Sequence, residues 1–164
     1  MTSMSARIVP YLWFNRQAEE AASFYVSLFP NSRITHRAHY PEDNPFPGQA
    51  GTLMLVEYEL DGQAFVALNG GPNYRLSPAM SLLVNCDSQA ELDRLFEHLT
   101  EGGEVQPCGW LADRFGLSWQ LVPRKLLELM RNSPPEVLSR IYASLMQMQK
   151  LDLATLETAA RQGS

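Results

Sequence analysis

Residues 8–29 read IVPYLWFNRQAEEAASFYVSLF, and this stretch decides the fold. The run 8–14 is apolar and aromatic, which is typical of a short buried strand, although Pro10 cannot donate a hydrogen bond to a neighbouring strand. From Gln17 to Phe29 apolar residues recur at helical spacing, on the face formed by Ala18, Ala21, Ala22, Tyr25, Leu28 and Phe29. The stretch therefore predicts a buried strand followed directly by an amphipathic helix.

The same order of elements recurs about 70 residues further along the chain. An apolar strand, Ala79–Cys86, precedes a helix, Ser88–Glu101, in which Ser88 and Glu91 have the spacing of a capping box. Further strands follow each helix: Arg33–His39, Thr52–Leu60 and Ala64–Asn69 in the first half, Val105–Leu111 and Leu117–Val122 in the second. The sequence therefore predicts an internal repeat in which a strand and a helix precede three strands.

The segment from residue 124 onward differs in kind, because it contains only helical patterns. We expect helices at Lys125–Met130, after Pro134, and at Leu153–Ala160 with Asp152 as its N-cap. The expected fold class is α+β, with paired βαβββ modules in one domain over residues 1–164: module 1 at about 7–72, module 2 at about 78–123, and a C-terminal helical extension at 124–161. Because neither module has a second layer to cover its sheet, the halves should pack together or with a partner chain.

Composition and charge argue against several classes of function. The formal net charge of −5 disfavours a nucleic-acid binder, which usually presents a basic face. No apolar run approaches the ~20 residues that cross a bilayer, and the first residues lack the features of a secretory signal. The two cysteines, Cys86 and Cys108, are most simply reduced thiols. We therefore expect a cytoplasmic protein with no nucleic-acid or membrane partner.

Three blocks of the chain resemble one known family. They are IVPYLWFNRQAEEAASFYVSLFPNSRIT at 8–35, FVALNGGP at 65–72 and CGWLADRFGLSWQLVP at 108–123. They are similar to the PhnB-like proteins of the vicinal oxygen chelate (glyoxalase/bleomycin-resistance) superfamily, commonly labelled 3-demethylubiquinone-9 3-methyltransferase domain proteins. The resemblance covers roughly residues 7–155. It implies paired βαβββ modules that each curl into a half-open cup, and a homodimer, but no agreed activity.

The usual chemistry of that superfamily uses a divalent metal held by His, Gln or Glu side chains inside the cup. The resemblance places these ligands at Val9 or Pro10, Val66 or Ala67, Ala79 or Met80, and Gln120. Of these only Gln120 could coordinate a metal, weakly, through its amide oxygen. The three histidines, His36, His39 and His98, are expected to be exposed without a ligand role. We therefore expect no metal and no other cofactor.

The methyltransferase label is not matched by a methyl-donor motif. Such sites typically use a glycine-rich turn between a strand and a helix, where the backbone approaches the cofactor closely. The turn after the first strand is Asn15-Arg16-Gln17, without glycine, and Asn69-Gly70-Gly71 leads into Pro72 rather than into a helix. We interpret the double glycine as a tight turn with positive φ.

Strand alternation identifies candidate ligand-binding residues. Val9, Tyr11 and Trp13 share the face that the resemblance puts inside the cup, and Ser118, Gln120 and Val122 share a face of the last strand. An aromatic wall with a few amide and hydroxyl groups is typical of a small-molecule pocket, although aromatic residues on short strands often simply belong to the core. Asp113 and Arg114 are expected to shape a hairpin turn. The candidate ligand-binding residues are Tyr11, Trp13, Asn69, Trp110, Ser118 and Gln120.

Three functions stay open at this point. The first is a metal-free aromatic cup that binds a small organic molecule. The second is an enzyme of the same fold, either a lyase or isomerase or the methyltransferase of the family label, with catalytic residues unknown. The third is a dimeric interaction module without a ligand.

Overall fold

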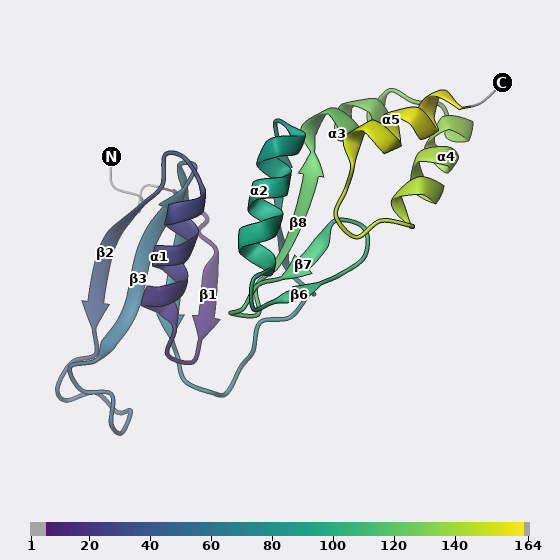
Figure 1. Cartoon of the computed structure of the whole chain (residues 1–164). Coiled ribbons are helices and arrows are strands. Elements are labelled where there is room, and N and C mark those ends of the chain that lie inside the picture. Colours follow the sequence, from purple (N-terminus) through teal and green to yellow (C-terminus); the bar gives the residue numbers. More distant parts are fainter. Residues whose placement is uncertain (1–5, 163–164) are drawn as a thin grey trace. The chain divides into compact units, whose positions relative to one another are not determined.

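The computed structural model describes residues 6–162, and the chain divides into two compact units between Leu76 and Ser77. The first unit contains β1 (Tyr11–Phe14), α1 (Ala18–Leu28), β2 (Arg33–His39), β3 (Leu53–Leu60) and β4 (Gln63–Asn69) (Figure 1). The second contains β5 (Ser81–Cys86), α2 (Gln89–Thr100), β6 (Glu104–Val105), β7 (Trp110–Ala112), β8 (Ser118–Pro123), α3 (Arg124–Arg131), α4 (Pro135–Leu145) and α5 (Leu153–Arg161). The α+β class, the two βαβββ modules and the C-terminal helices are therefore confirmed.

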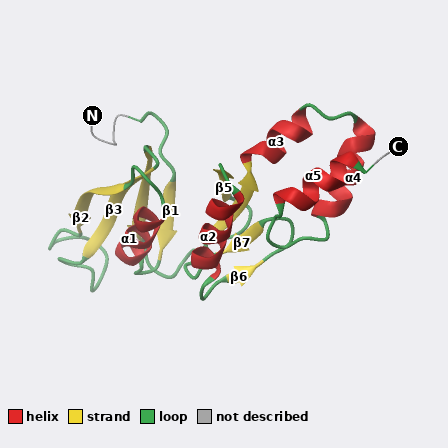
Figure 2. Cartoon of the chain, turned by 45° about the horizontal axis from the view of Figure 1, so that its top comes forward, coloured by secondary structure: helices red, strands yellow, loops and turns green. Residues whose placement is uncertain are grey.

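The first unit is a four-stranded sheet in the order β1-β4-β3-β2, with α1 across one of its faces (Figure 2). Strand β1 is parallel to β4, and β3 is antiparallel to both β4 and β2. The core lies between α1 and the sheet, where Tyr25 of α1 and Tyr58 of β3 are both fully buried and their ring centroids lie 6.4 Å apart. We call the opposite side of this sheet, which α1 does not cover, the first open face.

The second unit repeats this arrangement with the order β5-β8-β7-β6 and with α2 on one face. The helix begins as the sequence predicts, because the Ser88 hydroxyl accepts a hydrogen bond from the Glu91 backbone N–H (3.1 Å). Its apolar stripe, Leu92, Leu95 and Leu99, is fully buried. The side of this sheet away from α2 is called the second open face.

A buried carboxylate fixes the turn between β7 and β8. Asp113 is 3% exposed and accepts hydrogen bonds from the backbone N–H groups of Phe115 (2.9 Å) and Leu117 (3.1 Å). Its second oxygen accepts the indole N–H of Trp119 (2.9 Å). These three N–H groups offset the charge of the carboxylate locally, and the expected turn-shaping role of Asp113 is confirmed.

The first strand is shorter than the stretch 8–14 predicted for it. Strand β1 begins at Tyr11, and Ile8 is 84% exposed. The backbone N–H of Val66 donates to the carbonyl of Pro10 (3.0 Å), which is the last rung of the ladder. Because Pro10 has no N–H of its own, the pairing ends there.

The strand predicted at Val105–Leu111 is wrong as a single strand. Residues 106–109 form a turn, so that β6 and β7 pair with each other in antiparallel register. Pro107 cannot donate to a ladder, and Cys108 and Gly109 both have positive φ (63° and 85°). The split supplies the third strand of the second module.

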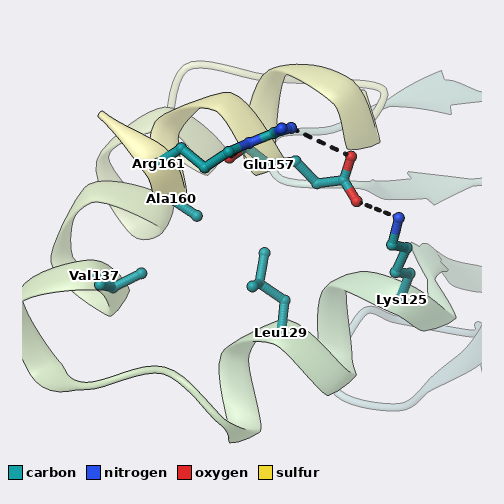
Figure 3. Close-up of a pocket in the computed structure, with 6 residues that line it drawn as sticks. All are labelled: Lys125, Leu129, Val137, Glu157, Ala160 and Arg161. Atoms are coloured by element: carbon teal, nitrogen blue, oxygen red, sulfur yellow. Dashed lines mark hydrogen bonds and ion pairs between the residues drawn. The ribbon is translucent and has the colours of Figure 1, made fainter. Parts of the chain in front are cut away.

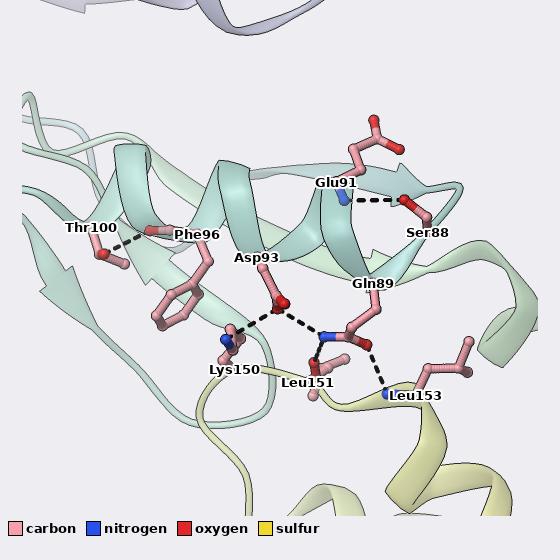
Figure 4. A network of polar contacts seen from close by, with 9 residues as sticks. All are labelled: Ser88, Gln89, Glu91, Asp93, Phe96, Thr100, Lys150, Leu151 and Leu153. Atoms are coloured by element: carbon pink, nitrogen blue, oxygen red, sulfur yellow. Dashed lines mark hydrogen bonds and ion pairs between the residues drawn. The ribbon is translucent and has the colours of Figure 1, made fainter.

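The segment that leads into α5 is bonded to α2 through Gln89 and through an ion pair between Lys150 and Asp93 (3.1 Å) (Figure 4). The side-chain amide of Gln89 donates to the Leu151 carbonyl (2.9 Å) and to an Asp93 oxygen (3.0 Å), and its oxygen accepts the Leu153 N–H (2.9 Å). The N-cap predicted for α5 is confirmed, because Asp152 accepts the N–H of Thr155 (2.8 Å). The segment before α5 is thereby anchored to the second module.

Within residues 6–162, each helix is too short or too polar to span a lipid bilayer.

Candidate functional site

Two aromatic side chains of β1 belong to the first open face. Leu12 and Phe14 are each 3% exposed and face α1, so the alternate residues Tyr11 and Trp13 point to the other side of the sheet. Tyr11 is 56% exposed. The alternation of side chains expected from the sequence therefore holds for β1, and the rings of Tyr11 and Trp13 lie outside the core between α1 and the sheet.

The indole of Trp13 is held by the double glycine that follows β4. Its N–H donates to the Gly71 carbonyl (2.9 Å), and the Tyr74 ring packs edge-on against it at 4.9 Å between centroids. A Cβ on Gly70 would lie 2.5 Å from the indole, which is closer than side-chain contacts allow. Gly71 has the predicted positive φ of 96°. The glycines at 70 and 71 thus serve to seat Trp13.

Asn69 lies on the other face. It is the register partner of Phe14, and its side-chain oxygen accepts the N–H of Ala18 (2.9 Å) while its amide donates to the Leu53 carbonyl (3.2 Å). The residue before α1, Gln17, makes no side-chain cap, so Asn69 supplies that cap from a distant strand. The structure thus does not bring Asn69 together with Tyr11 and Trp13.

The Tyr11 hydroxyl is a poor acid in this setting. Partial burial raises its pKa above the usual range, and the nearby Tyr40 and the negative charge of Glu57 raise it further. The phenol is therefore neutral at physiological pH and keeps its proton as a hydrogen-bond donor.

The second open face carries the polar candidates. Gln120 pairs in register with Leu83 on one side and Trp110 on the other, and its amide donates to the Ser81 hydroxyl (2.9 Å). Ser118, two residues earlier on β8, points to the same side as Gln120. The structure therefore brings Trp110, Ser118 and Gln120 together with Ser81, which the sequence analysis missed.

Ser118 is the anomaly of this face. It is 1% exposed, and its hydroxyl has no hydrogen-bond partner among residues 6–162. Such buried hydroxyls are rare, because losing water without a replacement bond costs about 1–3 kcal/mol. The carbonyl oxygen of the Gln120 side chain likewise makes no hydrogen bond within the described chain.

The donor set does not fit the divalent metal that the superfamily implies. The positions assigned to its ligands carry apolar side chains apart from Gln120, whose amide is bonded to Ser81. Over residues 6–162, no three His, Cys, Asp or Glu side chains are grouped as a metal ion would require.

The two cysteines occupy different settings. Cys86 is buried, and burial together with the charges of Glu91 and Asp87 raises the pKa of its thiol to about 12. The Cys108 sulfur lies 3.5 Å from the Met146 sulfur beside α4. The raised pKa keeps the Cys86 thiol protonated, whereas a nucleophilic cysteine must form a thiolate.

A separate hollow of about 370 Å³ lies among the C-terminal helices α3, α4 and α5 (Figure 3). Leu129, Val137 and Ala160 form its apolar side. Glu157 at its edge is bridged to Lys125 (2.7 Å) and lies 3.9 Å from Arg161. The acidic and basic groups at this edge are thus already paired.

The topology defines the class of protein: two βαβββ modules, each with a four-stranded sheet, are the vicinal oxygen chelate fold. The model of the 3-demethylubiquinone-9 3-methyltransferase family matches residues 6–122. The chain therefore belongs to this PhnB-like family.

Solved structures agree with this assignment. A PhnB protein of Bacillus cereus that bears the family's methyltransferase name is 35% identical, with 72% of this chain and 99% of that one covered and a TM-score of 0.65. A protein of Pseudomonas aeruginosa is 32% identical over 72% of this chain and 97% of its own, with a TM-score of 0.57. The fosfomycin resistance protein FosX of Mesorhizobium loti, 13% identical over 77% of this chain and 98% of its own (TM-score 0.53), shares the fold. No curated protein matched the chain.

Proposed function

We propose that this chain binds a small organic molecule through side chains of its open faces, without a metal ligated by the protein. In the second unit the binding residues are Trp110, Ser118 and Gln120. In the first unit they are Tyr11 and Trp13. The proposal is supported by the buried, unbonded hydroxyl of Ser118, on the same side of β8 as the Gln120 carbonyl oxygen, which makes no hydrogen bond within residues 6–162.

The polar groups of the second open face define what a ligand must offer. Ser81 holds the Gln120 amide nitrogen, so the amide is oriented and its oxygen remains as an acceptor. The Ser118 hydroxyl can donate and accept. With the Trp110 ring in the same row of the sheet, these groups suit an aromatic or other flat apolar molecule that carries a hydroxyl or carbonyl group.

Methyl transfer, which the names of the family and of the Bacillus cereus protein state, receives no support from the glycine turn. Gly70 lies against the Trp13 indole, and the Gly71 carbonyl accepts that indole's N–H. The turn is thus filled by a side chain of the same unit and offers no close approach for a methyl donor. Ligand binding is therefore the function that the residues support best.

The test is a thermal-shift screen of the full chain with hydroxylated aromatic and quinone-like compounds. We expect at least one compound to stabilise the wild type and to bind roughly tenfold more weakly to Gln120→Leu and Ser118→Ala. The exposed Glu104→Gln is the matched control and should bind like the wild type. If every compound that binds does so equally to all four proteins, or if no compound binds the wild type, this face is not a binding site.

We also propose that the chain forms a homodimer. Strands β1 and β5 are edge strands, so each has one side of its backbone unpaired within its own sheet. Such edges invite pairing with another strand. Sedimentation at micromolar concentration should give twice the mass of the chain, and a monomer there would refute the proposal.

A further inference from the structure

A row of four side chains crosses the first open face. In register from β1 to β2 the row is Tyr11, Val66, Glu57 and His36. Residues that are register partners in neighbouring strands point to the same side of a sheet. Because Tyr11 points away from α1, Glu57 does so as well, and the row places a carboxylate on the same face as the aromatic rings of β1.

Within residues 6–162, no ion pair neutralises the charge of Glu57. Glu57 is half-buried and forms no ion pair or hydrogen bond with the residues in 6–162 through its side chain. Two residues along the same strand, Glu59 is bonded to Arg33 (3.1 Å). Arg37 points to the opposite face, where it is bonded to α1, and the neighbouring His36 is exposed. The first open face therefore carries one unbalanced negative charge.

Aromatic surface lies within a ligand's length of that charge. Neighbouring strands are about 4.8 Å apart, so the backbones at Tyr11 and Glu57, two strands apart, are separated by roughly 10 Å. Trp13 follows on the same side of β1 as Tyr11. The Tyr11 phenol is itself held neutral, since partial burial and Glu57 raise its pKa. A carboxylate beside neutral aromatic rings is the environment in which ammonium groups bind, by charge and by cation–π attraction.

We propose that the molecule bound on the first open face is an organic cation: a protonated amine or quaternary ammonium on an apolar body. The ammonium group lies at the Glu57 carboxylate, and the apolar body packs on Tyr11 and Trp13. This inference rests on the proposed ligand-binding function and names the ligand's chemical class.

Three matched probes separate the charge from the apolar body: 2-phenylethylammonium, 2-phenylethanol and 3-phenylpropionate. Their affinities for the full chain are measured by saturation-transfer NMR titration at low salt. We expect the ammonium compound to bind roughly tenfold more tightly than the alcohol, and the carboxylate most weakly. Glu57→Gln should remove the preference for the ammonium compound while leaving the affinity for the alcohol unchanged. Glu59→Gln, which alters an already paired carboxylate on the same strand, should keep the preference.

The outcomes distinguish this inference from the proposed function. If the alcohol and the carboxylate bind as tightly as the ammonium compound, or if Glu57→Gln keeps the preference, the organic-cation assignment is refuted while ligand binding stands. If no phenyl compound binds and the aromatic screen also fails, the proposed function itself is refuted. If both variants lose the preference for the ammonium compound, that preference comes from the general negative charge of the chain, and the specific role of Glu57 is refuted.

Discussion

Replacement of Asp113 by asparagine changes one oxygen of a buried carboxylate into an amide donor. In the wild type, the buried Trp119 side chain (1% exposed) donates its indole N–H to one carboxylate oxygen (2.9 Å). The other oxygen accepts two backbone N–H groups, so the amide nitrogen must take the Trp119 side. Two donors then face each other in the core, which costs about 1–3 kcal/mol, and the two remaining bonds lose their charge assistance, which costs roughly 1 kcal/mol more.

The expected loss in the free energy of unfolding is therefore about 2–4 kcal/mol, and the melting temperature should fall by roughly 6–12 °C. The free energy of unfolding is measured by urea titration, followed by far-UV circular dichroism and by tryptophan fluorescence, to which Trp110 and Trp119 of the second unit contribute. The matched control is Asp87→Asn, which alters a surface ion pair with Arg124 and should leave the curve unchanged. An Asp113→Asn curve that superimposes on that of the wild type would show that this carboxylate does not stabilise the turn.

Three further predictions concern other sites. Gly70→Ala should displace the Trp13 indole, since the new Cβ would lie 2.5 Å from it; the emission of a variant retaining only this tryptophan measures the change, and an unchanged spectrum would contradict it. The pKa of the Cys86 thiol is about 12 in the folded chain and about 8.5 in the unfolded chain. Its contribution to stability is therefore complete below about pH 8.5. The free energy of unfolding should fall as pH rises from about 8.5 toward 12, by up to ~1.4 kcal/mol per pH unit. Urea titrations of wild type and Cys86→Ala between pH 8 and 10.5 test this, and equal slopes would refute it. Gln89→Leu should speed hydrogen exchange at the Leu153 amide roughly tenfold, and unchanged exchange would show that this bond is dispensable.

Much of the architecture follows from local sequence patterns. The helix faces, the capping box at Ser88 and the successive strands β3 and β4 depend on residues close together in the chain, and each is present. The exceptions have long-range causes. The turn at 106–109 is fixed by bonds from the backbone N–H groups of Cys108 and Gly109 to carbonyls of residues 148 and 149, which no local pattern reveals.

The candidate site was predictable only in part, because alternation gives the two faces of a strand but not which face is covered. Tyr11, Trp13, Ser118 and Gln120 lie on open faces, as alternation suggested, and Trp110 lies on the same face as Gln120, its register partner. Asn69 does not, because its side depends on the register between β4 and β1, which its own strand does not encode. The charge of Glu57 was overlooked because only the pairing with β2 shows that Arg33 neutralises Glu59 instead.

The most direct test of ligand binding at the second open face uses the side-chain N–H resonances of the full chain in a ¹⁵N NMR titration with a compound from the screen. We expect the resonances of the Gln120 amide and the Trp110 indole to shift, while that of the Trp119 indole, which is bonded to Asp113, stays unchanged. Shifts confined to Trp119 or to the C-terminal helices, with Gln120 and Trp110 unaffected at saturation, would contradict it.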